Sequence, residues 1–162
     1  MQEVEHTQVE WVILCDYAQM ADGKLFLQGG GWERLTVNDD FPSKRIVGIA
    51  TSILIPWAET NQPTNLEIEV QTEDAQTLAK INAQLKVGRP PDHPPGMPVR
   101  ATVAANLGLT FKTAGSYVII ARLEEQVMKR TTFYVIPGPL LAMKQQQQQV
   151  EQQRGGDQPV PE

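Results

Sequence analysis

Three adjacent glycines, Gly29, Gly30 and Gly31, are the first residues of this sequence whose types could do chemistry. Glycine-rich loops bind phosphate when they lie between a strand and a helix, with a Lys-Ser/Thr pair or an acidic residue at a set spacing. Neither context is present here, because strand-like patterns flank the triplet on both sides. We therefore interpret the glycines as a bend or β-bulge between two strands.

The two histidines form no recognisable metal or catalytic pattern. His6 lies near the N-terminus and His93 lies in a proline-rich run, so they share no spacing typical of metal ligands. Asp92 beside His93 could act as an acid–base pair, but neighbouring residues of an extended segment point apart. We therefore expect no catalytic residue, no cofactor and no metal ligand in the chain.

Several loop carboxylates could in principle gather and bind calcium, since hard oxygen ligands can come from different loops. No Asp-x-Asp ligand series is present, and Asp favours turns because it bonds to the local backbone. We therefore interpret these residues as solvated turn positions. They are Asp39, Asp40, Glu59 and Asp92.

Aromatic residues offer another chemistry, because a tryptophan ring can stack on a sugar or anchor a protein partner. Trp11 lies within an apolar strand pattern and is expected in the core. Trp57 follows a proline and begins a polar loop, so it is the best candidate for exposure. The residues that we expect to contact a ligand or partner are Trp32, Trp57, Arg89 and His93.

Composition limits the classes of function and compartment. The chain has 162 residues, a net charge of −5 and no basic stripe with interleaved aromatics, so we expect no nucleic-acid binding. Its longest apolar run, 11–15, is far shorter than the roughly 20 residues that span a bilayer. The start lacks the basic residues of a signal peptide, and the single Cys15 excludes an internal disulfide. We therefore expect a cytoplasmic protein without membrane contact.

The elements that must position these residues are strands. From residue 9 to 136, short β-rich runs are broken by Gly, Pro, Asn or Asp at a spacing typical of sandwiches and barrels. Asp22-Gly23 predicts a hairpin turn, and 45–55 is nearly continuously apolar, which predicts the most buried strand. Glutamates alternate with apolar residues over 66–71 and lysines over 80–87, so the two segments predict a hairpin with opposite charges facing.

These patterns predict an all-β, antiparallel β-sandwich of about nine strands, immunoglobulin-like or with a similar Greek key. We predict a flexible N-terminus over 1–8, the sandwich domain over 9–137 and a Gln-rich disordered tail over 138–162. Within that tail, 140–144 could form a short helical turn. The glutamine tract could be an interaction tail or an incipient coiled coil, but it lacks apolar heptads, so a low-complexity linker is favoured.

Several segments of the sequence resemble an uncharacterised bacterial family that is defined by a domain of unknown function. The resemblance covers about residues 9 to 136, and it implies a compact β-domain of bacterial origin with no functional residues to carry over. The segments that carry it are CDYAQMADGKLFLQGGGW at 15–32, IPWAETN at 55–61, VGRPP at 87–91, and Asn106-Leu107 with Gly115-Ser-Tyr117.

Function is therefore an expectation from the whole pattern. The strand pattern accounts for nearly every residue and leaves none for acid–base or metal chemistry, so we expect a non-catalytic interaction or assembly module. Its partner would be a protein, including a second copy through edge-strand pairing. The alternative is a module that binds a small ligand or carbohydrate through the loop aromatics.

Overall fold

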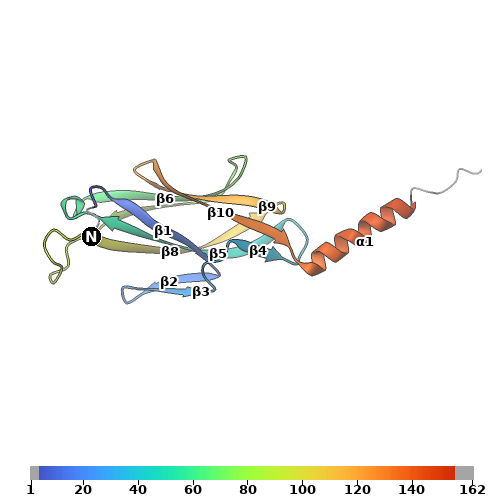
Figure 1. The fold of residues 1–162 in the computed structure, drawn as a ribbon, viewed down its shortest axis with the longest axis horizontal. Helices are drawn as coiled ribbons and strands as arrows, with labels where there is room; N and C mark the ends of the chain where they lie inside the picture. Colours follow the sequence, from blue (N-terminus) through green and yellow to red (C-terminus); the bar gives the residue numbers. More distant parts are fainter. Residues whose placement is uncertain (1–3, 156–162) are drawn as a thin grey trace, which may run out of the picture.

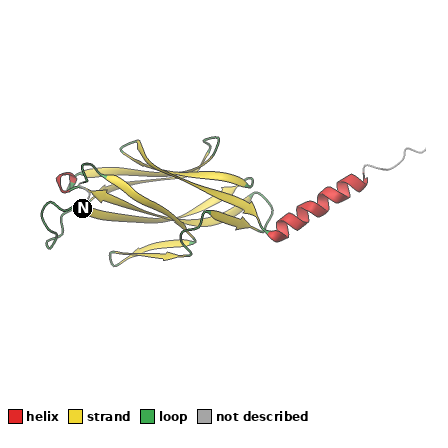
Figure 2. Cartoon of the chain, viewed as in Figure 1, coloured by secondary structure: helices red, strands yellow, loops and turns green. Residues whose placement is uncertain are grey.

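The computed structural model describes residues 4–155 and shows two packed sheets, a separate hairpin and a C-terminal helix (Figures 1 and 2). One sheet has the order β1 (Gln8–Cys15), β5 (Ser43–Ile55) and β8 (Val99–Phe111). The other has the order β4 (Arg34–Val37), β10 (Gln126–Pro137), β9 (Gly115–Leu123), β6 (Pro63–Thr72) and β7 (Thr77–Lys86). The predicted all-β sandwich is confirmed.

The strand order is that of an immunoglobulin-like sandwich. β1, β5 and β8 take the places of strands A, B and E, while β6, β9 and β10 take those of C, F and G, with β7 as C′. Pairing is antiparallel throughout the two sheets except that the short β4 runs parallel to β10. The Tyr117 hydroxyl donates to the Thr113 carbonyl at 2.7 Å, which is the tyrosine corner of this architecture.

The core lies between the two sheets and follows from the alternation along each strand. On β5, Val47, Ile49 and Ile53 point inward and are fully or almost fully buried. Phe111 and Phe133 meet edge to face at 6.1 Å between ring centroids at one end of this core. The prediction that 45–55 forms the most buried strand agrees with this arrangement, since the strand is buried almost continuously from Val47 to Ile55.

The hairpin of β6 and β7 pairs an acidic strand with a basic one, as the alternation predicts. Glu69 lies opposite Lys80 in the register. The Lys80 amine lies 3.3 Å from a Glu67 carboxylate oxygen and 4.0 Å from one of Glu69. Opposite charges therefore face each other on the outer surface of this sheet.

Residues 4–155 contain ten strands where about nine were predicted, because the apolar run from 9 to 17 is not one strand. β1 ends at Cys15, the chain turns at Asp16, and β2 (Tyr17–Ala21) pairs with β3 (Lys24–Gln28) outside both sheets. A short 3₁₀ helix, η1 (Trp57–Glu59), follows β5. The corner at Asp16 has no signal in the hydrophobic pattern, because both halves of the run are β-rich.

The two termini differ from the predicted boundaries. Helix α1 (Pro139–Gly155) occupies much of the segment 138–162 that was predicted to be disordered, and residues 156–162 lie outside the described residues. Gln, Lys, Leu and Met are good helix formers and Pro suits a first helical position, which explains the helix. At the other end, the Thr7 amide donates to Glu59 at 2.8 Å, so part of the predicted flexible segment 1–8 is bonded to η1.

Helices in the described part of the chain include none with both the length and the apolar character that crossing a bilayer requires.

Candidate interaction surface

The hairpin β2–β3 is an insertion that is not part of the immunoglobulin-like sandwich. It is inserted between β1 and β4 and lies against the outer face of the three-stranded sheet (Figure 1). Its inner face places Ala18 and Leu25 against a small cluster formed by Cys15, Ala50 and Ala104. The hairpin therefore has its own small core, separate from the main one.

The turn of this hairpin follows directly from its sequence. Asp22 and Gly23 occupy the two central positions, with φ values of 49° and 69°. Two left-handed residues in a two-residue loop match the right-handed twist of the flanking strands, which is why Asp-Gly is favoured there. Ala21 and Lys24 close the ladder on either side. The predicted hairpin is confirmed.

A side-chain clamp ties the hairpin to the sheet beneath it. The Asn106 amide nitrogen donates to the Ala18 carbonyl at 2.8 Å, and the Ala18 amide donates to the Asn106 side-chain oxygen at 2.9 Å. One side chain of β8 thus satisfies both backbone groups of one β2 residue. Because both bonds are partly buried, they fix the position and the angle of the hairpin.

Close backbone approach makes this position possible. A Cβ added to Gly48 of β5 would lie 2.6 Å from the Cys15 sulfur and 3.1 Å from the Ala18 nitrogen. Only a glycine therefore lets β2 lie directly on β5. Sequence reasoning did not single out Gly48, which stands alone within an apolar strand.

The end of the hairpin opposite its turn is held by Asp16 and the glycine triplet. The Asp16 amide donates to the carbonyls of Gln28 and Gly29 at 3.0 and 3.2 Å, and the Gly31 amide donates to the Leu14 carbonyl at 2.8 Å. Gly29 has φ 56°, and a Cβ there would lie 2.1 Å from a carboxylate oxygen of Asp16. The triplet is thus the connection between β3 and β4, as a bend between two strands, and no helix follows it.

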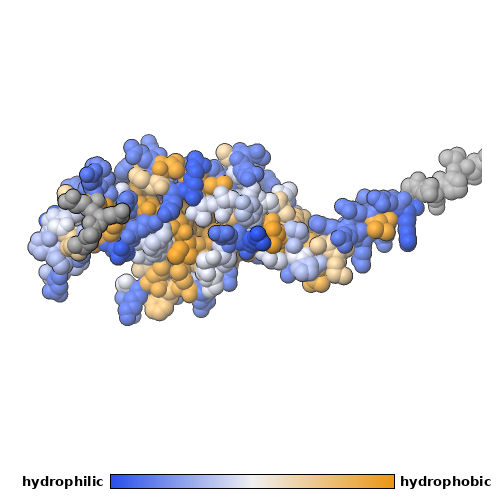
Figure 3. All heavy atoms as spheres, viewed as in Figure 1, coloured by the Kyte–Doolittle hydropathy of each residue, from blue (hydrophilic) through white to orange (hydrophobic). Residues whose placement is uncertain are grey.

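Exposed apolar side chains lie on both faces of this fixed hairpin. On its outer face Tyr17 is 45% exposed and Phe26 54%, while Met20 and Leu27, on the face that carries Ala18 and Leu25, remain 39% and 36% exposed. Ile46 of β5, 68% exposed, lies on the outer face of the three-stranded sheet, the face that also carries Gly48 and Ala50 beneath the hairpin. We call Tyr17, Met20, Phe26, Leu27 and Ile46 the hairpin patch. Figure 3 shows apolar surface gathered over the hairpin and the adjoining sheet.

The hairpin patch can bury apolar surface but cannot carry out acid–base or metal chemistry. Its five side chains include no carboxylate, imidazole or amine, and one hydroxyl, that of Tyr17. Large aromatic and methionine side chains are enriched at the centres of protein interfaces. The strands that carry these side chains are held by the hydrogen bonds of Asn106 and Asp16.

Three of the four residues predicted to contact a ligand lie together at the end of the sandwich where β5 ends. The Arg89 guanidinium carbon lies 4.3 Å from the centre of the Trp57 ring, and the His93 ring is nearly parallel to that ring at 6.3 Å. Arg89 also donates to the Thr60 hydroxyl at 2.7 Å and to the Trp57 carbonyl at 3.0 Å. These bonds fasten the proline-rich loop to η1.

His93 is also held by its own loop. Its Nε2 lies 3.2 Å from the Met97 carbonyl and 3.1 Å from the Pro98 carbonyl, so this nitrogen carries the proton that is shared between them. The polar groups of Arg89 and His93 are therefore hydrogen-bonded within the protein. We interpret the cluster of Trp57, Arg89 and His93 as a clasp for the loop.

Trp32, the fourth predicted residue, lies elsewhere. Its ring packs edge to face on Phe133 at 6.0 Å, and its indole nitrogen donates to Asp16 at 3.2 Å. Gly31, just before it, bonds to Leu14, which pairs with Ile49 of β5, whereas Trp57 follows the end of β5 at Ile55. The structure thus supports Trp32 as part of the hairpin connection and does not place it beside Trp57.

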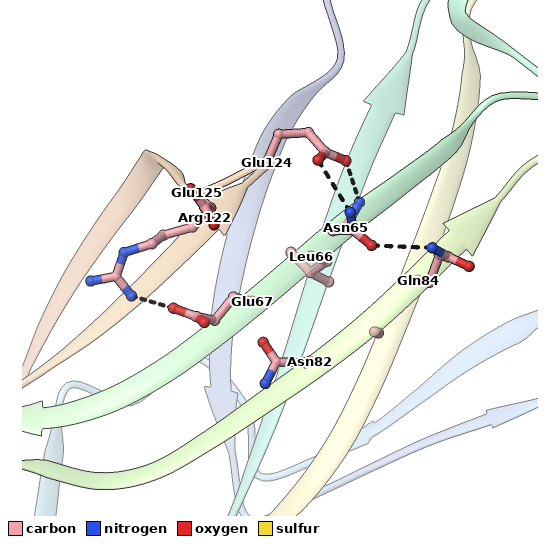
Figure 4. Close-up of a pocket in the computed structure, with 9 residues that line it drawn as sticks. Asn65, Leu66, Glu67, Asn82, Gln84, Arg122, Glu124 and Glu125 are labelled. Carbon is pink, nitrogen blue, oxygen red and sulfur yellow. Dashed lines mark hydrogen bonds and ion pairs between the residues drawn. The ribbon is translucent and has the colours of Figure 1, made fainter.

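A hollow of about 730 Å³ lies on the outer face of the five-stranded sheet, beside the turn between β9 and β10 (Figure 4). Asn65 and Glu124 close one side, where the Glu124 carboxylate accepts from the Asn65 amide at 2.6 Å and from its side chain at 3.2 Å. Arg122 and Glu67 form the other side. The lining contains no aromatic ring on which a sugar could stack.

The charges beside this hollow are compensated within the sheet. One Arg122 nitrogen lies 2.7 Å from Glu67 and 2.7 Å from Glu69, whose side chain is only 8% exposed. The hydroxyl of Thr77 and the guanidinium of Arg122 lower the pKa of Glu69, and the Glu69 carboxylate raises the pKa of Arg122. Together with Lys80 this is a neutral ion network, which favours a structural role.

Other candidate chemistry is equally limited within residues 4–155. No three His, Cys, Asp or Glu side chains there converge as metal ligands would. Cys15 is completely buried, and burial raises the pKa of its thiol, which keeps it in the unreactive protonated form. Cys15 therefore packs as a small hydrophobic residue.

Sequence reasoning missed the residues that build the hairpin patch, although it predicted the hairpin itself. The available signal was three consecutive apolar residues, Leu25, Phe26 and Leu27, in a strand of five residues. Such a strand presents apolar side chains on both faces, so one face must remain outside any single core. Asn106 and Ile46 gave no local signal, because their roles depend on a strand that is distant in sequence.

Comparison with known proteins gives a family but no activity. No curated protein matches the chain. A Pseudomonas fluorescens alkylpurine DNA glycosylase, AlkC, solved with DNA containing an abasic site analogue, is similar with a TM-score of 0.46 and 6% identity over 80% of this chain. A glycosyl hydrolase family 2 member from Bacteroides cellulosilyticus gives 0.40 and 11% over 57%. The chain spans only 30% and 13% of those two proteins.

An immunoglobulin-like protein from Pseudomonas aeruginosa is similar over 83% of this chain and 98% of its own length, with a TM-score of 0.38 and 13% identity. The sequence itself matches a family of unknown function, DUF6941, over residues 10–136. That match spans the sandwich from β1 to β10 together with the inserted hairpin and ends before α1. The chain therefore belongs to the DUF6941 family.

Proposed function

We propose that this protein is a non-catalytic interaction module that binds a protein partner through the hairpin patch. The observation that carries the proposal is the exposure of Phe26 and Tyr17 on a hairpin that lies outside both sheets. Exposed apolar side chains that are contiguous, rather than scattered singly, mark binding surfaces on folded proteins.

The way in which the hairpin is held supports this proposal. A loose hairpin would bury its aromatics against the sheet, because apolar side chains lose free energy by leaving water. Asn106 and Asp16 instead fix its two strands, so the outer aromatics cannot turn inward without breaking these bonds. The protein thus keeps an apolar surface exposed at the expense of its own stability.

The second candidate, a site for a small ligand or carbohydrate, is less well supported. Arg89 covers the ring of Trp57, so stacking a sugar on that side would require breaking its bonds to Thr60 and to the Trp57 carbonyl. Trp32 lies in a different part of the sandwich. The hollow in Figure 4 is lined by groups that already pair with one another.

Site-specific photo-crosslinking tests the proposed surface. A benzophenone amino acid would replace Phe26 in one variant of the full chain and Tyr134 of β10 in a matched control, because both are large exposed aromatics, at 54% and 47%. In cells that encode the protein, we expect one discrete adduct from position 26 and none from position 134.

A second pair of variants separates binding from folding. Phe26→Ser should change the unfolding free energy by less than about 0.5 kcal/mol, because a surface side chain contributes little to stability. A photo-crosslinker placed at position 17 in that background should then lose its adduct. Equal adducts at 26 and 134, or an adduct at 17 that survives Phe26→Ser, would refute the hairpin patch as the binding surface.

A further inference from the structure

Helix α1 extends away from the sandwich and is anchored only at its start (Figure 1). Leu141 is buried, and Lys144 pairs with Asp40 at 2.6 Å. From 143 to 154 every residue is exposed. An unsupported helix of 17 residues is only marginally stable in water, so its exposed part needs a second source of stability.

Although this segment lacks a full apolar heptad repeat, three exposed apolar residues and two polar ones lie along one side of the helix at heptad spacing. They follow one another at intervals of three and four, which places them on one face, as in positions a and d of a heptad. Leu140, Met143 and Val150 are the apolar members, with exposures of 69%, 58% and 51%. The complete stripe is Leu140, Met143, Gln147, Val150 and Arg154.

A shallow, open hollow runs along this stripe. It has a volume of about 560 Å³ and is lined by six residues of α1. These six form two overlapping sets of four at positions i, i+3, i+4 and i+7, and each such set is the hole that receives one side chain of a facing helix. The sets are Met143, Gln146, Gln147 and Val150, and then Gln147, Val150, Glu151 and Arg154.

The charges beside the stripe indicate which helix fits it. Lys144 lies near the start of α1 and Glu151 near its end, both on the same flank of the stripe. An antiparallel second α1 would bring Lys144 of one copy, whose amine also pairs with Asp40 of its own chain, close to Glu151 of the other. A parallel one would instead place Arg154 against Arg154. The glutamines at 145–149 carry no charge that would oppose either arrangement.

We propose that α1 pairs antiparallel with α1 of a second copy of this chain. Met143 and Val150 then lie within the pair, and the two sandwiches lie at opposite ends of it, because α1 extends beyond its own sandwich (Figure 1). The pairing surface is separate from the hairpin patch, which stays free in both copies to bind a partner. Two hairpin patches on one dimer would bind a repeating partner with higher avidity.

Sedimentation equilibrium of the full chain tests this proposal between about 10 μM and about 1 mM, since two heptads give weak association. Val150→Asp should weaken association at least about tenfold, because it places a charge within the pair. Gln152→Asp is the matched control, since it adds the same charge on the opposite face and should leave association unchanged. Wild-type chain that remains at 18.0 kDa up to the highest concentration would overturn the proposal.

Orientation and folding are checked separately. A mixture of Lys144→Cys and Glu151→Cys chains should form a mixed disulfide under mild oxidation, and Glu151→Cys alone should not link to itself. Efficient self-linking of Glu151→Cys would overturn the antiparallel arrangement. Far-UV circular dichroism should show that Val150→Asp and Gln152→Asp lose helix to the same extent in dilute samples. A loss confined to Val150→Asp there would mean that the side chain supports α1 within one chain, against the proposal.

Discussion

The side-chain amide of Asn106 on β8 bonds to both the N–H and the C=O of Ala18 on β2. A single side chain thus substitutes for a neighbouring strand at one position of a hairpin that belongs to neither sheet. The hairpin patch depends on this relationship, since it is the side-chain link between β2 and the sandwich. The stability of the hairpin and the exposure of its aromatics can therefore be tested independently.

Asn106→Ala should loosen the hairpin more than the sandwich. The change leaves two partly buried backbone groups of Ala18 without partners, which costs about 1–3 kcal/mol. Hydrogen exchange should become faster at β2 and β3 amides and remain slow in β9. Asn82→Ala, on the exposed face of β7, is the matched control. Unchanged exchange at β2 would show that the clamp does not hold the hairpin.

Gly48→Ala should destabilise the protein by about 1–3 kcal/mol, because the added Cβ meets Cys15, the Tyr17 carbonyl carbon and the Ala18 nitrogen at 3.1 Å or less. Gly108→Ala is a matched control on the adjacent strand, since a Cβ there has no heavy atom within 4 Å. Chemical denaturation of both variants measures the difference. If the two alanines had equal effects, the cause would be strand propensity and not the contact with the hairpin.

The sandwich could be predicted from the sequence because its information is local. Alternation at 66–71 and 80–87 places apolar side chains on one face, and the opposite charges of the two segments predict that they pair as a hairpin. The hairpin turn followed from Asp22-Gly23 for the same reason. The departure of β2 from the sheet could not be predicted, because it depends on Gly48 and Asn106, which approach β2 only in three dimensions.

The candidate residues show the same limit. Trp57, Arg89 and His93 were predicted to be near a binding surface, and the structure brings them together, but as a clasp in which Arg89 bonds to Thr60 and to the Trp57 carbonyl. The residue types predicted where these side chains lie but not the hydrogen bonds that they make within the protein. For α1, the glutamines of the tail suggested disorder, whereas their helix propensity had greater weight in the structure.

The ion pair of Glu10 with Arg100 should stabilise the protein at neutral pH, and this stabilisation should be lost in acid. Arg100 donates to this carboxylate at 2.5 and 2.7 Å, and with Ser52 it lowers the pKa of Glu10 from 4.5 to about 2. A carboxyl whose pKa is lowered by folding stabilises the folded state above pH 4.5, and this contribution is lost as the pH falls towards 2. Because Arg100 is more than half exposed, we expect about 1–2 kcal/mol after screening.

Urea denaturation of wild-type protein and Glu10→Gln at pH 6, 4 and 2.5 measures this contribution. Other carboxylates with lowered pKa values, such as Asp39 and Glu59, weaken both proteins alike as the pH falls. The difference between the two proteins should therefore be largest at pH 6 and clearly smaller at pH 2.5, where the pH approaches the lowered pKa of Glu10. A difference that is constant with pH would assign the effect to lost packing instead of charge.

Arg122→Gln should be the most pH-sensitive of these variants, because it leaves two carboxylates facing each other with only Lys80 to compensate them. Glu69 is nearly buried and accepts bonds from both Thr77 and Arg122, so its charge loses most of its stabilisation when the guanidinium is removed. We expect a loss of about 2–3 kcal/mol at pH 7, as for other partly buried ion pairs that lose one partner. Folding lowers the pKa of Glu69, so the stabilisation is fully present above its ordinary value of 4.5 and is lost progressively as the pH falls from there through the lowered pKa. At pH 3 the variant should therefore approach the wild type.

Arg130→Gln, the same change at an exposed position of β10, should have little effect at either pH. If Arg122→Gln were as harmless as Arg130→Gln at pH 7, the network would not stabilise the sheet, and Arg122 would be free to bind a ligand in the hollow beside it.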